Sequence, residues 1–253
     1  MRRVYRESLS DDARTWLCKR TFQIIDAGHQ HAKLAQRIKA RKKRASDLWD
    51  AERTIAFDEI DRVLRRMAPG NELCMYCEHN TGSDIEHFWP KEKYPGLAYT
   101  WENYLWTCAI CNSHFKGSKF PRDENGAPLL VNPAEEDPRE HLELTPTTGK
   151  YVHRTKKGEA TIPVLGFDRR PALDRSRHDA WIGVQAYIVS YAKACNRGDA
   201  PLALYAQRAL CRHPLASVLS TLMDVLGSPR AALLIEQDCI TAIEAHPEIR
   251  DWP

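Results

Sequence analysis

Three stretches decide the fold of this sequence: Cys74-Met-Tyr-Cys77, Asp84-Ile-Glu-His-Phe-Trp-Pro90 and Cys108-Ala-Ile-Cys111. Each Cys-x-x-Cys turn presents two thiolates on one tight loop, and two such turns complete the tetrahedral four-ligand shell that a structural zinc ion prefers. The 30 residues from 78 to 107 exceed the spacing of a simple zinc ribbon, so the metal would clamp the base of an inserted element. We therefore predict a structural Zn²⁺ held by Cys74, Cys77, Cys108 and Cys111.

The other cysteines do not share this spacing. Cys18, Cys195, Cys211 and Cys239 lie in helix-like sequence with no partner, where a cysteine usually acts as a small core residue. His79, close to the first pair, is a rival zinc ligand, although a histidine at such a position is more often a surface loop residue. The alternative in which one pair is coincidental also stays open.

Composition limits the classes of protein that the chain can form. Its 253 residues are 43% hydrophobic, enough for one substantial core or two modest ones, and its formal net charge is only +3. Any nucleic-acid surface must therefore be a local patch. The N-terminus lacks an apolar segment of the signal-peptide kind, and no run of about 18 apolar residues occurs. We expect a soluble, cytoplasmic protein without a membrane partner. The sequence makes no prediction of its oligomeric state.

The periodicity of apolar residues predicts a mostly α protein with a small α+β insert. Residues 1–70 form a helical N-terminal region that ends at Pro69-Gly70, and residues 71–121 have no long periodic run, as expected for short strands and loops around a metal. Successive turn signals predict a loop or hairpin bridge over 122–167. Helical periodicity returns in 168–253, with about four helices.

These motifs resemble a known family. Glu86-His87-Phe88-x-Pro90, Asn103-Tyr-Leu and Cys108-x-x-Cys111-Asn112 are similar to the HNH endonuclease motif on a zinc-clamped ββα-metal module. More narrowly, the text from about 72 to 121 resembles the HNH nuclease component of Septu-type bacterial anti-phage systems. The resemblance implies that Asn103 orients the histidine or its loop and that Lys116 or Lys119 contacts phosphate. It also implies a separate ATPase partner, since this chain has no phosphate-binding Gly-x-x-x-x-Gly-Lys-Ser/Thr loop.

The chemistry of phosphodiester hydrolysis accounts for the residue types at the centre of this window. A neutral histidine is a fitting base near pH 7, and we assign that role to His87. Mg²⁺, or Mn²⁺ in its place, prefers oxygen ligands, which Glu86 and Asn112 would supply. Asp84 lies two residues before Glu86, on the same face of a strand, and is an alternative carboxylate ligand.

Two surface features complete the sequence prediction. From Lys33 to Arg44, seven of twelve residues are basic and none is acidic, so this helix either follows a nucleic-acid backbone or presents a solvated face; its candidate contacts are Lys39, Arg41, Lys42, Lys43 and Arg44. The cluster Arg169, Arg170, Arg175 and Arg177 is a second basic surface or, as easily, a salt-bridge network at a helix start with Asp168, Asp174 and Asp179. Trp89, Trp101 and Trp106 are expected in the core of the small module.

Together these observations predict an HNH-type endonuclease that hydrolyses DNA with Mg²⁺ at a site separate from a structural zinc. Two alternatives remain: a catalytically silent zinc module that binds nucleic acid or a partner protein, and an RNase on the same scaffold.

Overall fold

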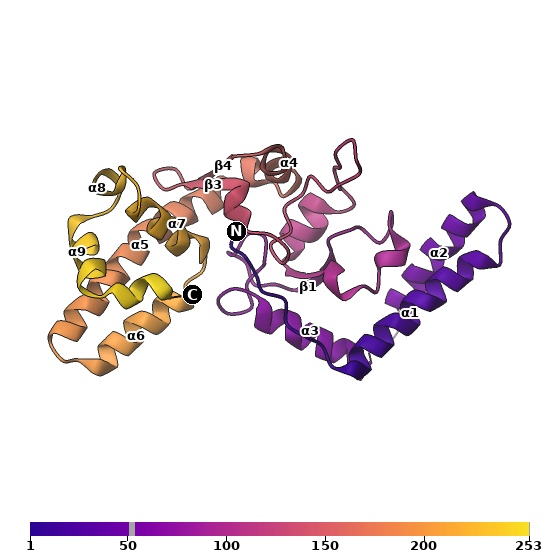
Figure 1. Ribbon diagram of the computed structural model, residues 1–253, viewed down its shortest axis with the longest axis horizontal. Coiled ribbons are helices and arrows are strands. Elements are labelled where there is room, and N and C mark those ends of the chain that lie inside the picture. The colour runs from indigo at the N-terminus through magenta and orange to yellow at the C-terminus, as the bar shows by residue number, and fades with distance from the viewer. Residues whose placement is uncertain (51–53, 253) are drawn as a thin grey trace.

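The computed structural model describes residues 1–50 and 54–252 and is mostly helical with two small two-stranded sheets, as predicted. The molecule is elongated (Figure 1). A hairpin of α1 (Asp11–His29) and α2 (Leu34–Trp49) forms one end, and the C-terminal helices form the other. The sheet that contains β1 lies between them, so the predicted catalytic window is placed centrally.

Local sequence explains the N-terminal helices. The hydroxyl of Ser10 accepts a hydrogen bond from the backbone N–H of Ala13 and thereby caps α1. Thr54 caps α3 (Ile55–Met67) in the same way. The apolar residues of α3 recur at helical spacing and are buried against the centre of the molecule. Helix α3 ends at Met67, before Pro69, as the sequence predicted.

The central window contains strands β1 (Asp84–His87) and β2 (Tyr104–Thr107), which pair antiparallel with Asp84 opposite Thr107 and His87 opposite Tyr104. Short 3₁₀ turns, η1 (Pro95–Leu97) and η2 (Trp101–Asn103), connect the strands. A short π-helix, η3 (Ile110–Lys116), begins inside the second cysteine turn. Insertions of this type widen the helix locally and recur at functional sites.

The bridge region is more ordered than predicted. The expected hairpin is present as β3 (Leu142–Thr145) and β4 (Lys150–His153), preceded by η4 (Pro138–Glu140). The sequence did not predict α4 (Lys156–Val164), which Thr155 caps and η5 (Phe167–Arg169) follows. Gly158 and Pro163 obscured this helix, because both residues weaken helix propensity in isolation. Tertiary packing stabilises it, since Thr161 is fully buried and bonded to the backbone of Val131.

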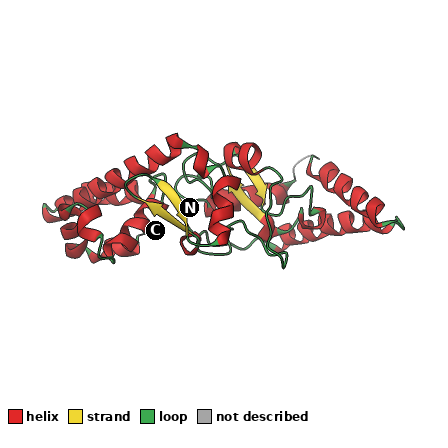
Figure 2. Ribbon diagram, turned by 90° about the horizontal axis from the view of Figure 1, so that it is seen from above, coloured by secondary structure: helices red, strands yellow, loops and turns green. Residues whose placement is uncertain are grey.

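The C-terminal region is a helical bundle (Figure 2). Its central helix is α5 (Pro171–Asn196), which packs most extensively against α6 (Ala200–Cys211) and α9 (Gln237–Ala245). The remaining elements are α7 (Ser217–Leu226), α8 (Ala231–Leu234) and η6 (Pro247–Asp251). Among the described helices, none has the length and apolar character needed to cross a bilayer.

Candidate metal centre and active-site cleft

The four knuckle cysteines meet in the interior. Cys74, Cys77, Cys108 and Cys111 are buried, and all their sulfur atoms lie within 4.8 Å of one another. None of the four forms a disulfide. A Zn–S bond of about 2.3 Å implies sulfurs roughly 3.8 Å apart in a tetrahedron, and the Cys77 and Cys108 sulfurs are 3.9 Å apart. The cluster therefore fits a structural metal ion such as zinc.

The surroundings of the cluster supply hydrogen-bond donors to two of the four sulfurs. The side-chain amide of Asn80 and the backbone N–H of Cys111 point at the Cys108 sulfur at 3.7 and 3.5 Å, and Arg170 donates to the Cys111 sulfur at 3.2 Å. Hydrogen bonding with the neighbouring thiols lowers the pKa of Cys77 and that of Cys108, the latter to about 7, whereas burial raises the pKa of Cys74 and hydrogen bonding with Cys108 raises that of Cys111. A lowered thiol pKa eases the deprotonation that metal binding requires.

Strand β1 and helix η3 face each other beside this cluster. The side-chain amide of Asn112 donates to the Asp84 carboxylate at 3.3 Å. One turn further along η3, the ammonium of Lys116 forms an ion pair with Glu86 and donates to the backbone oxygen of His87 at 3.0 Å. The alternation of side chains along β1 explains this arrangement, because Asp84 and Glu86 point to the same face.

Two adjoining cavities form a cleft over this arrangement. One, of about 450 Å³, is lined by Glu86, His87 and Asn112, and the other, of about 490 Å³, is lined by Asp84 and Asn112. Both also touch Trp49, at the end of α2, so the cleft extends between the window and the N-terminal hairpin. Three of the four predicted catalytic residues therefore share one cavity.

The position of His87 is fixed from two sides. Its Nε2 lies 3.0 Å from the Ala98 carbonyl oxygen, so Nε2 carries the proton and Nδ1 keeps a free lone pair. Its ring contacts Trp49, with centroids 4.3 Å apart, and Tyr104. Burial is the main cause that lowers the pKa of His87 to about 3, and the nearby ammonium of Lys91 acts in the same direction. The imidazole is neutral at pH 7, as a base must be, but it is a weak base in this environment.

Burial shifts the pKa of Glu86 in the opposite direction from that of His87. The side chain of Glu86 is 4% exposed, and burial raises its pKa to about 7, although the adjacent Lys116 opposes that shift. A carboxylate that is already paired with a buried ammonium is poorly placed to bind a hard cation. Asp84 is more exposed and already lies against Asn112. The sequence left open which carboxylate would bind Mg²⁺, and the geometry favours Asp84 over Glu86.

Asn103 lies beneath the cleft and holds the loop after β1. Its side-chain oxygen accepts from the backbone N–H of Trp89 at 2.6 Å, and its amide donates to the carbonyls of Trp89 and Leu97. Because Leu97 directly precedes Ala98, the carbonyl partner of His87, these bonds fix the loop that orients the histidine. Asn103 itself does not line the cleft.

The lysines expected to contact phosphate occupy different positions. Lys116 is fully buried, so its ammonium faces Glu86 instead of a surface phosphate. A buried, paired ammonium does not fit the phosphate contact that the resemblance implied for Lys116. Lys119 is exposed and bonds the backbone oxygen of Phe115. Trp49 was not singled out from the sequence, since it lies more than 30 residues before His87 and only the fold brings the two together.

The basic segment of α2 is helical and largely exposed, as predicted. Lys39 and Lys42 face solvent, whereas Lys43 pairs with Asp47 at 2.7 Å. Arg41 packs against Gly28 of α1, where even a β-carbon would collide with its guanidinium. Arg44 is partly buried. The segment therefore offers fewer free charges than its composition indicates.

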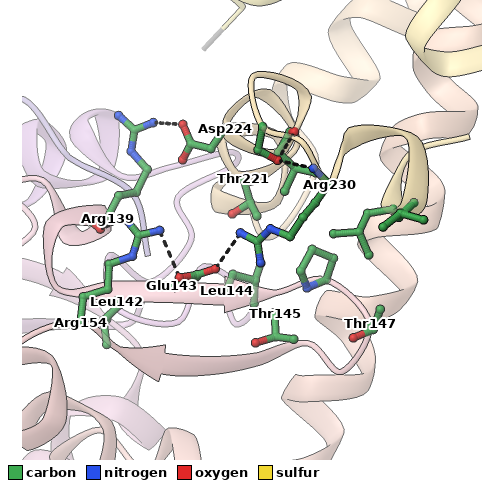
Figure 3. A pocket seen from close by; sticks show the side chains of 15 residues that line it. Arg139, Leu142, Glu143, Leu144, Thr145, Thr147, Arg154, Thr221, Asp224 and Arg230 are labelled. Atoms are coloured by element: carbon green, nitrogen blue, oxygen red, sulfur yellow. Dashed lines mark hydrogen bonds and ion pairs between the residues drawn. The ribbon is translucent and has the colours of Figure 1, made fainter.

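A separate cavity of about 460 Å³ lies between the β3–β4 hairpin and the turn from α7 to α8 (Figure 3). Its charges are paired: Glu143 lies between Arg154 and Arg230, at 3.2 Å from each, and Arg139 faces Asp224 at 3.2 Å. Because every arginine in this cavity already has an acidic partner, it lacks the free groups that a catalytic or anion site needs.

Fold and site together define a mostly helical protein with a central four-cysteine metal site beside a polar cleft. Two curated proteins are similar to it. The Septu protein PtuB of Bacillus mycoides (strain KBAB4) is 36% identical over 143 residues, which cover 45% of this chain and 48% of that protein. The Septu protein PtuB of Bacillus thuringiensis is 33% identical over 119 residues, covering 44% of this chain and 42% of that protein.

The similarity therefore spans about half the length of each curated relative. No family model matches the sequence. No solved structure matches it. The relation to Septu proteins thus rests on sequence identity over less than half of this chain.

Proposed function

We propose that this protein is an HNH-type endonuclease that hydrolyses DNA phosphodiester bonds with Mg²⁺, and that it is the nuclease of a Septu-type anti-phage defence system. The similarity to Septu proteins PtuB supports the defence role. The observation that carries the proposed chemistry is the cleft: His87, with an unprotonated Nδ1, and Asn112 line one cavity, and Asn112 and Asp84 line the adjoining one. A separate ATPase subunit would control the reaction.

The residues divide the work of hydrolysis as follows. His87 accepts a proton from the attacking water at Nδ1, while the carbonyl of Ala98 holds the ring through Nε2. Asn103 keeps that carbonyl in place by clamping the loop that carries it. Asp84 and Asn112 would hold the Mg²⁺ ion, which when bound neutralises the charge that gathers on the phosphate.

Nicking of a supercoiled plasmid tests the proposal. We expect cleavage that depends on added Mg²⁺ or Mn²⁺ and that falls roughly 10²- to 10⁴-fold in a His87→Ala variant, the usual contribution of a general base. His153→Ala is the matched control, because His153 is exposed on β4 and far from the cleft. Undiminished cleavage by His87→Ala would overturn the assignment.

A second candidate is a zinc-stabilised binding module without catalysis. The packing of Trp49 on the His87 ring favours it, because a covered base cannot reach water. The same plasmid assay separates the two functions when it is run with Trp49→Ala. Faster metal-dependent cleavage by that variant identifies a covered catalytic site, whereas DNA binding without cleavage in both proteins identifies a silent module. An RNA substrate in parallel distinguishes DNase from RNase.

A further inference from the structure

The structure separates the arginine cluster at the start of α5 into four different environments. Arg177 is buried and pairs with Asp174 at 3.4 Å, and Arg169 pairs with Asp168 at 3.3 Å. Arg170 donates to the Cys111 sulfur. The side chain of Arg175 is exposed and, within the described part of the chain, has no hydrogen bond or ion pair. The predicted salt-bridge network therefore accounts for Arg177 and Arg169 alone.

Arg175 lines a groove of about 530 Å³, which we call the α5 groove. Its walls come from the first knuckle, from η3 and from the start of α5; they include His79, His114, Arg169, Arg170 and Arg175. The described lining contains no acidic residue. The cavity of Figure 3 is the opposite case, since each of its arginines faces an acid. Among the three arginines of the α5 groove, Arg169 has an acidic partner and Arg170 a cysteine sulfur, so Arg175 is the positive side chain that the described contacts leave uncompensated.

Helix η3 separates this groove from the active-site cleft. Asn112 and Ser113 line the cleft, whereas Ile110, His114 and Phe115 line the groove. A helix with its side chains is about 10–12 Å wide, and one strand of B-form DNA places a phosphate about every 3.4 Å along its axis. A strand held in the cleft would therefore reach the groove within a few phosphates.

We infer that the α5 groove is a second DNA contact of the nuclease, in which Arg175 binds a backbone phosphate on the far side of η3 from the cleft. This inference rests on the proposed function for its substrate. The exposed imidazole of His114 lies beside the same path and faces the groove. Arg169 and Arg170 are held over the ring of Phe115, so they shape the groove and add charge while Arg175 makes the contact.

Equilibrium binding tests this inference without any cleavage. Fluorescence anisotropy would measure the affinity for a labelled duplex in Mg²⁺-free buffer at several salt concentrations. We expect Arg175→Gln to lower the slope of log affinity against log salt by about 0.9, the value for one lost phosphate contact on B-DNA. Arg175→Glu should weaken binding further. Arg208→Gln and Arg208→Glu are matched controls, because Arg208 is exposed without a described partner on α6, remote from β1 (Figure 1).

Arg175 variants that bind DNA as the Arg208 variants do would overturn the inference. The same holds if they bind DNA normally but lose a protein partner, because the groove would then be a docking site for protein. Unchanged melting temperature and zinc content show that the variants fold. If the wild type never cleaves DNA but the Arg175 slope changes as expected, the inference stands and the proposed hydrolysis fails.

Discussion

The four-cysteine cluster and the cleft beside it are built on opposite principles. In the cluster, the four sulfurs converge on one point, so the ligand set for a metal ion is assembled without further movement of the chain. In the cleft, most polar groups already have a protein partner: Lys116 holds Glu86, the Ala98 carbonyl holds His87, and backbone groups hold Asn103. The difference indicates that the cluster stabilises the fold. In the cleft, few polar side chains remain available to bind a metal ion, so each candidate ligand needs its own test.

Loss of the cluster is expected to have the largest effect. Cys108→Ser removes one of four ligands, and structural zinc contributes about 10–16 kcal/mol of apparent binding free energy in small zinc domains. We expect the variant to lose zinc and the window 71–121 to lose its protection from amide hydrogen exchange. Cys18→Ser is the control, since Cys18 is exposed and outside the cluster. Removal of Mg²⁺ alone should leave exchange unchanged; if it unfolds the window, the separation of the two sites is wrong.

Disruption of the buried ion pair comes next. Lys116→Met leaves the Glu86 carboxylate buried without its partner, which typically destabilises a protein by about 3–5 kcal/mol. Urea unfolding measures this loss, and the double variant Lys116→Met/Glu86→Gln should recover most of it. Lys119→Met should change stability by less than about 0.5 kcal/mol, because Lys119 is on the surface. Equal effects of the two lysine variants would contradict a buried, paired Lys116.

The choice between the two carboxylates gives a smaller and more specific effect. We expect Asp84→Asn to weaken Mg²⁺ or Mn²⁺ binding at least about tenfold, or about 1.4 kcal/mol, because it removes a charged ligand beside Asn112. Glu86→Gln should alter stability more than metal affinity. Calorimetric titration with each ion measures affinity without turnover. A larger loss of metal affinity in Glu86→Gln than in Asp84→Asn would identify Glu86 as the carboxylate ligand.

The sequence predicted the parts of this molecule that local patterns determine. Cys-x-x-Cys turns fix their own geometry, so the cluster could be predicted from spacing alone. The window could also be delimited, because Pro69-Gly70 ends α3 and the apolar period stops there. Asn103, assigned by resemblance, donates to the Leu97 carbonyl in the loop that leads to the carbonyl partner of His87, while its role in a reaction stays a prediction.

Long-range contacts could not be predicted in this way. Nothing in the text around Trp49 indicates that its ring packs on His87, because the contact depends on how the N-terminal hairpin folds back. The resemblance implied a phosphate contact for Lys116, and only the β1–η3 contact shows that its ammonium has a buried partner. Helix α4 was missed for a related reason, since its stability comes from buried packing instead of its own propensity.

The last prediction concerns the pH dependence of stability, and it separates the two buried groups of the cleft. The pKa of His87 is about 3 in the folded protein against an ordinary 6.5. The unfolded chain therefore binds more protons between these values, and the stability that neutral His87 contributes is complete above pH 6.5 and lost as the pH falls toward 3. Glu86 acts in the opposite direction, because its pKa rises from 4.5 to about 7 on folding and its contribution declines as the pH rises through that window.

Comparison of the wild type with His87→Ala cancels the Glu86 contribution, since both proteins retain that residue. We expect the difference in free energy of unfolding between the two proteins to shrink by up to about 1.4 kcal/mol per pH unit on acidification below pH 6.5. Urea unfolding at pH 6.5, 5.5 and 4.5 measures it. A constant difference would mean that His87 is hydrated and titrates normally, in which case Trp49 does not cover the base and the cleft is open to water without rearrangement.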